Sequence, residues 1–252
     1  MKTKKLISFL IAILLISGTL SAQPKFLLNV NGGLSIPLPD LKGDVATVPI
    51  ATTFEKDYGM KLGFNFGAHG KYAFDKDCKI RGVVGLTYNI FMNPGEYASV
   101  TGSYKYKPMI NIFTTSLGIE YAFQPTEKYS PFIGADFTAN FFSGSFEYDP
   151  PFTGIPNISL TSATRFGLQF NLGTDVALNE NIGLVVGMKY HLANLIGKDS
   201  DTSAFSLVLP NERPLNDGEY TYAGRTVSAK NISYVQIYAG LTFFFNQQKK
   251  TK

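Results

Sequence analysis

The chain of 252 residues contains no tryptophan, one cysteine and two histidines. The single cysteine, Cys78, has no partner for an internal disulfide, and no metal-ligand spacing surrounds it. We expect a plain thiol beside a turn; the alternative in an exported protein is a link between two chains. Neither a metal site nor a cofactor is predicted.

Net charge is also small. The 23 basic and 19 acidic residues give a formal charge of +4, but three lysines stand within the first five residues. Without these three, 20 basic residues face 19 acidic ones. Because no basic stripe remains, we expect no nucleic-acid partner.

Long apolar runs are missing after the N-terminus. Residues 1–22 resemble a secretory signal peptide, in which lysines precede the apolar run 6–16 and small residues lead to a predicted cleavage after Ala22. The run is too short for a membrane-spanning helix, and no later stretch reaches the ~20 apolar residues that such a helix needs. An uncleaved anchor helix is the alternative.

What the sequence has instead is alternation of apolar and polar residues. From Phe166 to Leu172 every second residue is apolar, and the same pattern resumes after the break at 179–181. Successive side chains of a strand point to opposite faces, so this stretch predicts a hairpin with one apolar and one polar face. Eight segments carry the pattern: 26–36, 60–74, 79–92, 108–123, 129–146, 162–178, 182–194 and 232–245.

The connections between these segments alternate in length. Those at 75–78, 124–128 and 179–181 are short, and those at 38–59, 93–107, 148–161 and 195–231 are long. All short turns therefore lie at one end of an up-and-down barrel, as in outer-membrane barrels. We predict one all-β domain, an eight-stranded antiparallel transmembrane β-barrel over residues 23–245, followed by a polar tail at 246–252.

Alternation alone does not tell whether the apolar face points outward, because a soluble lipocalin-type barrel or a sandwich also alternates. The polar faces carry few charges in mid-strand, aromatic residues gather at strand ends, and the tryptophan usual near the first lipocalin strand is absent. These features favour a membrane barrel. In lipid every backbone hydrogen bond must be internal, so the sheet must close.

Several short motifs resemble one family of such barrels. They are Ser-Ala-Gln at 21–23, Asn-Val-Asn-Gly-Gly-Leu at 29–34, Gly-Leu-Thr-Tyr at 85–88 and Ile-Tyr-Ala-Gly-Leu-Thr-Phe-Phe-Phe at 237–245. In these the chain resembles the PorT-like outer-membrane β-barrel family of the Bacteroidetes, and its architecture is similar to small OmpA- and OmpX-type barrels. The resemblance implies residence in outer-membrane lipid and insertion by the barrel assembly machinery, which reads an aromatic end such as Phe245. The tail after Phe245 departs from that pattern, and the family has no common catalytic motif.

The interior of an eight-stranded barrel is just wide enough for side chains to fill it, and buried charges must pair. We predict a polar ladder in which Lys61, Lys71, Arg81 and Lys189 pair with Glu120, Asp136 and Asp175. For Lys61, Lys71 and Lys189 the alternative is that they reach water at the rims.

An acyl-transfer or lipid-modifying enzyme would need an imidazole base, and only His69 and His191 offer one. Counted from the turns, they lie near opposite ends of the barrel. Ser116 and Asp136 face inward but lie across the barrel from the strand of His191. We therefore expect both histidines to be hydrogen-bonded fillers, and no catalytic residue is predicted.

The long loops are the better candidates for function, because binding residues concentrate on loops above rigid scaffolds. The second long loop has a strip of Tyr97, Tyr104, Tyr106, Lys105 and Lys107, and the fourth has the charged residues Asp199, Asp201, Glu212, Arg213, Asp217 and Glu219. The run 199–201 lacks the fixed loop of a calcium site, so a solvated surface is expected. Both loops are candidates for hairpins above the membrane.

The sequence thus predicts a monomeric, non-enzymatic protein of the cell outer membrane. Its predicted role is structural or interactive through the outer loops, including an accessory role in a secretion or envelope system. The alternatives are a lipid-modifying barrel enzyme and a narrow channel for small apolar solutes.

Overall fold

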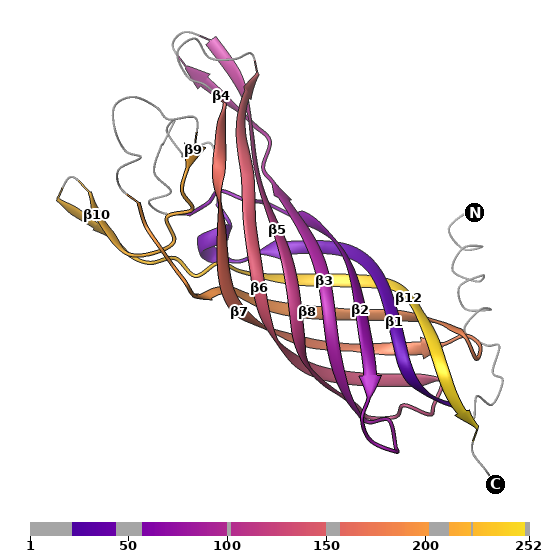
Figure 1. Cartoon of the computed structure of the whole chain (residues 1–252). Helices are drawn as coiled ribbons and strands as arrows, with labels where there is room; N and C mark the ends of the chain where they lie inside the picture. The colour runs from indigo at the N-terminus through magenta and orange to yellow at the C-terminus, as the bar shows by residue number, and fades with distance from the viewer. Residues whose placement is uncertain are drawn as a thin grey trace, which may run out of the picture.

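The computed structural model describes residues 22–43, 57–99, 102–149, 157–201, 212–222 and 224–249. Eight long antiparallel strands close into a barrel, because the first strand pairs with both the second and the last (Figure 1). These strands are β1 (Ala22–Pro37), β2 (Gly63–Ala73), β3 (Ile80–Met92), β5 (Gly102–Ala122), β6 (Tyr129–Asp149), β7 (Ile158–Ala177), β8 (Ile182–Ile196) and β12 (Ser233–Lys249). The predicted eight-stranded barrel is confirmed.

The two ends of the chain are only partly described. The predicted signal peptide, 1–22, lies outside the described residues except for Ala22, where β1 begins, and it stays a prediction. At the other end the backbone of β12 runs on to Lys249, pairing with β1. The last strand therefore enters the segment that the sequence predicts as a polar tail.

Short turns join the strands at one end of the barrel, and side-chain acceptors hold two of them. In the first turn, Asp75 accepts hydrogen bonds from the backbone N–H groups of Lys79 at 3.1 Å and Ile80 at 2.8 Å. In the last, Asn179 Oδ1 accepts from two backbone N–H groups at 2.9 Å. Cys78 stands in the first turn with φ 56°, and burial raises the pKa of its thiol.

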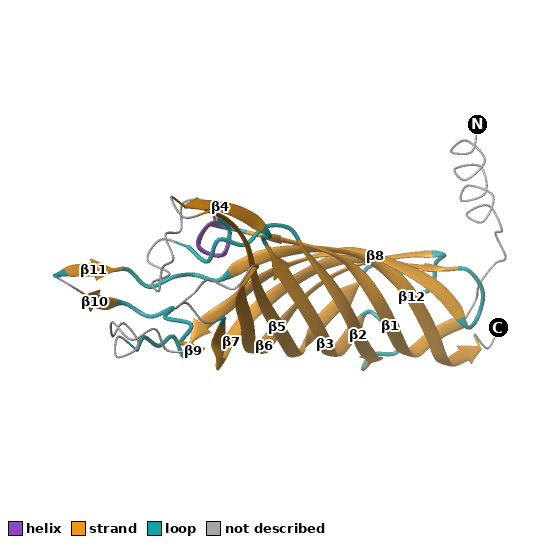
Figure 2. Ribbon diagram, turned by 90° about the horizontal axis from the view of Figure 1, so that it is seen from above, coloured by secondary structure: helices purple, strands orange, loops and turns teal. Residues whose placement is uncertain are grey.

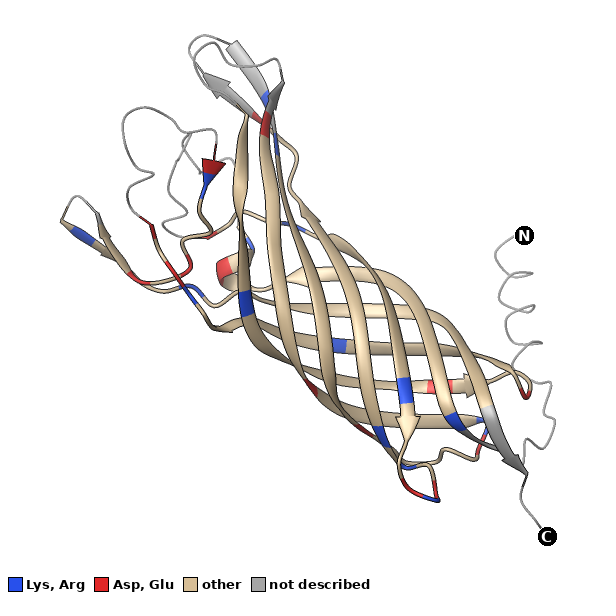
Figure 3. Ribbon diagram, viewed as in Figure 1, with Lys and Arg blue, Asp and Glu red and all other residues tan. Residues whose placement is uncertain are grey.

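The apolar face of the barrel points outward. On β5, Leu117 is 66% and Ile119 62% exposed, whereas Ser116 and Glu120, on either side of this pair, are buried. Asp136 on β6 is also buried, so the predicted register of both strands is confirmed. Charged residues gather at the two ends of the barrel and are sparse along its strands (Figure 3). The predicted orientation, with the apolar side chains toward lipid, follows.

Three strands continue beyond the barrel on the side of the long loops. We call this part of the sheet the outer wall: residues 102–111 of β5, 143–149 of β6 and 158–163 of β7, with β4 (Gly95–Ser99) paired to β5 (Figure 1). The predicted hairpin in the second long loop is confirmed by the β4–β5 pairing. A register shift between Phe142 and Gly144 marks where β6 leaves the barrel.

The fourth long loop also forms strands above the barrel mouth (Figure 2). Within it, β10 (Tyr220–Tyr222) and β11 (Arg225–Val227) pair as a hairpin, while β9 (Glu212–Arg213) pairs in parallel with β7. The first long loop contains a 3₁₀ turn, η1 (Pro39–Leu41). Over the described residues, no helix has the length and apolar character needed to cross a membrane.

Candidate functional site in the barrel interior and mouth

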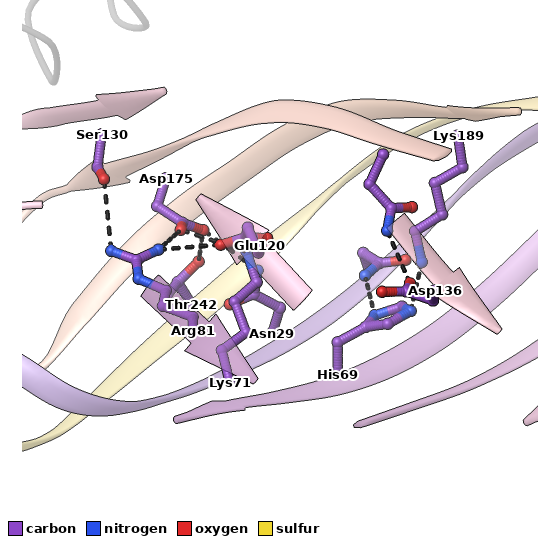
Figure 4. A network of polar contacts seen from close by, with 12 residues as sticks. Asn29, His69, Lys71, Arg81, Glu120, Ser130, Asp136, Asp175, Lys189 and Thr242 are labelled. Carbon is purple, nitrogen blue, oxygen red and sulfur yellow. Dashed lines mark hydrogen bonds and ion pairs between the residues drawn. The ribbon is translucent and has the colours of Figure 1, made fainter. Parts of the chain in front are cut away.

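Four charged side chains form a buried cluster near the short-turn end, which we call the ionic layer. Lys71 Nζ lies 2.8 Å from Glu120 Oε2 and 3.4 Å from Asp175 Oδ2, and Arg81 Nη1 lies 3.1 Å from each carboxylate (Figure 4). Each of the four side chains is at most 4% exposed. Two cations thus meet two anions from four strands, and the predicted ladder is confirmed for these residues.

Neutral groups complete the ionic layer. Asn29 Nδ2 donates to Asp175 Oδ1 at 3.2 Å, Thr242 donates to the same oxygen at 3.4 Å, and Arg81 Nη2 donates to Ser130 at 3.4 Å. The ammonium of Lys71 also lies 3.7 Å from the ring centroid of Phe132. Buried charges need such additional bonds, because paired charges alone do not offset their loss of hydration.

A second buried cluster, which we call the middle layer, contains His69, Asp136 and Lys189. The ammonium of Lys189 contacts His69 Nε2, and Asn31 Nδ2 lies 3.1 Å from His69 Nδ1. Asp136 Oδ2 accepts from the amides of Asn171, at 2.7 Å, and Gln169. Lys189 therefore has a histidine as its nearest partner, and Asp136 is held by two amides. The predicted pairing with an opposite charge is therefore wrong for Lys189 and Asp136.

Two glycines make room for His69. A Cβ atom at Gly85 would lie 2.5 Å from His69 Cδ2 and 2.5 Å from Ser116 Oγ, and one at Gly67 would lie 2.9 Å from His69 Cε1. Contacts this short do not occur for real Cβ atoms, so a larger residue at Gly85 would displace the imidazole. Neighbouring small residues are thus part of the site.

Lys61 is exposed and lies before β2, so its prediction as a member of the interior ladder is wrong and the alternative, that it reaches water at the rim, is confirmed. The alternation breaks there: Met60 is buried in the mouth while Lys61 and Leu62 are both exposed. The physical reason is that strand parity holds only within the strand, and β2 begins at Gly63.

The prediction that the two histidines lie near opposite ends is also wrong. Lys189, which contacts His69, is two residues from His191 on the inward face of β8, a spacing of roughly 6–7 Å. The stagger of strands in a closed barrel means that distance from a turn does not measure height along the axis. His191 stacks on Tyr234 with ring centroids 4.4 Å apart, and its Nε2 lies 3.0 Å from Gln236 Oε1.

Toward the loop end the interior becomes apolar. We call this cluster the apolar plug, and its members are Leu41, Tyr58, Met60, Phe91, Ile110, Ile112, Phe142, Phe146, Ile158, Leu160, Ala193, Leu215, Ile232 and Tyr234. It explains why the sequence has apolar residues of both parities in 109–113: Ile110 and Ile112 point into the plug. The first long loop contributes Leu41, Tyr58 and Met60 to the plug, and the fourth contributes Leu215.

A buried ion pair anchors the fourth loop to the barrel mouth. Asp217 is fully buried and accepts from Arg165 Nε at 2.9 Å and Nη2 at 2.8 Å, and from Asn194 Nδ2 at 2.9 Å. Tyr58 in the first loop donates to the backbone oxygen of Leu215 at 2.8 Å. Burial, and then the charge of Asp217, hold the pKa of Tyr58 well above its usual value.

The expectation of a solvated fourth loop is therefore wrong for Asp217, which this anchor buries, and for Arg213, which is also buried; Asp199, Asp201, Glu212 and Glu219 are exposed as expected. The run 199–201 forms a turn against Asp217, in which the backbone N–H of Asp199 donates to Asp217 and that of Asp201 to Asn216. In the described part of the chain, no group of three His, Cys, Asp or Glu side chains is placed to hold a metal ion. The side chains of Tyr97, Tyr104 and Tyr106 lie outside the described residues.

A closed barrel with a lipid-facing apolar surface and a filled interior defines an integral outer-membrane β-barrel. The model of the outer membrane protein β-barrel domain family matches residues 7–209, and the chain belongs to this family. It is accordingly a protein of the cell outer membrane.

Solved structures that resemble this one are also small outer-membrane proteins. Neisserial surface protein A is 16% identical, with 88% of this chain and 97% of that chain covered and a TM-score of 0.47. A major outer membrane protein from Thermus thermophilus is 12% identical, with 87% and 99% covered and a TM-score of 0.48. OprG from Pseudomonas aeruginosa is 15% identical, with 91% and 100% covered and a TM-score of 0.46. No curated protein matches the sequence.

Proposed function

We propose that this chain is a non-enzymatic, monomeric outer-membrane protein with a structural or interaction role, exerted through the outer wall and the loops around it. The observation that carries the proposal is the contrast between the two parts of the barrel. Its described interior is filled by the ionic layer, the middle layer and the apolar plug, whereas its sheet continues outward well past the lipid.

The position of the lipid boundary supports this reading. From Phe123, just after β5, back to Phe113, the outward side chains are apolar except for Thr115. At about 3.3 Å per residue and a strand tilt of about 40°, this stretch spans roughly 25 Å along the barrel axis, which matches the apolar band of such barrels. Beyond Phe113 the outward residues of β5 and β6 are polar or charged apart from Met109: Asn111 pairs with Ser143 and Lys107 with Glu147 in register, and Lys105 is exposed further along β5. The outer wall thus carries charges of both signs beyond the membrane, which supports binding to a protein partner or an extracellular ligand of complementary charge.

The two alternatives have less support. A channel for small apolar solutes would have to pass the apolar plug and two layers of paired polar groups. A lipid-modifying enzyme would need a nucleophile beside an imidazole that is held by a carboxylate, whereas the described partners of His69, which are Asn31, Thr87 and Lys189, include no carboxylate. The resemblance to PorT-like barrels supports an accessory role in a secretion or envelope system.

Site-specific photo-crosslinking in intact cells tests the proposal. A photoreactive residue at Lys107 or Glu147, on the outward face of the wall, is expected to yield a discrete adduct with an envelope protein or an extracellular ligand. The matched control is Leu117, which lies on the same face of β5 but in the lipid belt. No adduct from the wall, or the same adducts from Leu117, would contradict an interaction role, and steady conductance in a planar bilayer would favour the channel.

A further inference from the structure

A small cavity lies between the ionic layer and the middle layer. Its volume is about 10 Å³, which leaves room for one water molecule. Figure 4 shows the two groups of side chains that bound it, separated along the barrel. The cavity is lined by Asn29, Lys71, Val83, Glu120, Phe132 and Tyr238 near the ionic layer and by Asn31, His69, Asn171 and Lys189 near the middle layer.

Two lining residues present buried acceptors. Asn29 Oδ1 and Asn171 Oδ1 accept no hydrogen bond from any described residue. Their amide nitrogens are engaged, because Asn29 Nδ2 donates to Asp175 and Asn171 Nδ2 donates to Asp136. The orientation of both amides is thereby determined, since turning either one would place its oxygen against a carboxylate.

Lys189 places a hydrogen-bond donor at the same cavity. Lys189 has three N–H donors, and the contact with His69 Nε2 uses one of them. A buried acceptor without a partner, or a buried ammonium with free donors, is costly, so the three groups together require an occupant that bonds to all of them.

The charges around the cavity decide what that occupant is. A cation would lie beside the ammonium groups of Lys71 and Lys189, and an anion would face two amide oxygens and the Glu120 carboxylate. A water molecule donates twice and accepts as well, which fits two acceptors and one donor. We propose that the cavity is a binding site for a single water molecule, which donates to Asn29 Oδ1 and Asn171 Oδ1 and accepts from Lys189 Nζ.

The bound water joins the two layers into one hydrogen-bonded network. Without it, Asn29 belongs to the ionic layer and Asn171 to the middle layer, with no described hydrogen bond between the two groups. With it, Asp136 and Asp175 are connected through two amides and a water, and Lys189 bonds to the same water. Such connected networks stiffen a buried polar interior.

A crystal structure that resolves ordered solvent tests the site, together with two matched variants. Val83→Ile adds a methyl group at the cavity wall, and Val84→Ile makes the same change one residue along, where the side chain is 59% exposed to lipid. The native protein and Val84→Ile are expected to show one solvent peak within about 3.2 Å of all three atoms, and Val83→Ile is expected to lose it. Absence of the peak from the native protein, its persistence in Val83→Ile, or an anomalous signal there after a bromide soak would overturn the proposal.

Unfolding in urea gives an independent readout. Displacing the water leaves two acceptors and an ammonium without their partner, so Val83→Ile should raise the unfolding equilibrium constant about tenfold or more. Val84→Ile should change it less than about threefold. A dry cavity predicts the opposite sign, because filling it would lower the constant.

Discussion

Neutralising Glu120 is the most direct test of the ionic layer. In Glu120→Gln the shape is kept, but Lys71 and Arg81 are left to share the single carboxylate of Asp175, at 3.4 Å and 3.1 Å. The substitution removes the anion from two charge-assisted hydrogen bonds, one to Lys71 at 2.8 Å and one to Arg81 at 3.1 Å. Each such bond contributes roughly 1.5–3 kcal/mol. The expected loss is about 3–5 kcal/mol, the range for breaking a buried pair on one side.

The free energy of unfolding is measured by urea titration in lipid vesicles. Because the chain has no tryptophan, far-UV circular dichroism follows the folded fraction. The matched control is Glu147→Gln, an exposed carboxylate on the outer wall, which should change stability by less than about 0.5 kcal/mol.

A compensating variant separates charge balance from shape. Lys71→Met combined with Glu120→Gln leaves Arg81 opposite Asp175, so the buried charge is again balanced. The double variant should be more stable than Glu120→Gln alone by about 1 kcal/mol or more. A cost of Glu120→Gln below about 1 kcal/mol, or full additivity of the two changes, would refute the view that paired charges hold this end of the barrel together.

Three further predictions concern the middle layer and the mouth. Gly85→Ala should destabilise the barrel by about 1–3 kcal/mol in the same titration because it displaces His69, whereas Gly95→Ala, where a Cβ meets nothing within 4 Å, should not; equal effects would contradict the packing described. Asp217→Asn should loosen the fourth loop and speed its cleavage by protease on intact cells at least about tenfold relative to the exposed control Glu219→Gln; equal rates would mean that the Arg165 pair does not anchor the loop. Since the pKa of Tyr58 lies well above 10.0 in the folded state, its contribution to stability is fully present below pH 10.0 and is lost as the pH rises beyond it; Tyr58→Phe should lose less stability over that rise, and an unchanged pH profile would contradict the burial of its hydroxyl.

Much of the fold is readable from the sequence because strand parity is a local property. Each alternating segment became a strand, and the parity placed Lys71, Arg81, Glu120 and Asp175 inside the barrel. The prediction failed where a residue lies outside its strand, as for Lys61, since no local pattern marks the first paired residue.

The partners inside the barrel were less predictable. Asp136 accepts hydrogen bonds from two amides and forms no ion pair with a described residue. His69 contacts Lys189, which lies 120 residues away in the sequence. Which inward residues share a layer depends on the offsets between neighbouring strands, added up around the closed sheet. No single segment of the sequence records this total offset. The glycines beside His69 were visible as small inward residues, but only the packed structure shows what occupies the space they leave.

By itself the sequence predicted eight membrane-crossing strands with apolar side chains toward lipid, because the alternation comes with few mid-strand charges and with aromatic residues at the strand ends, and because a sheet in a bilayer must close. The tertiary structure alone decided that the interior is sealed in layers, with Ile110 and Ile112 in an apolar plug and Asp217 buried under Arg165. These features arise from loops returning to the barrel mouth. Contacts between segments distant in sequence depend on closure and stagger, which no local pattern records.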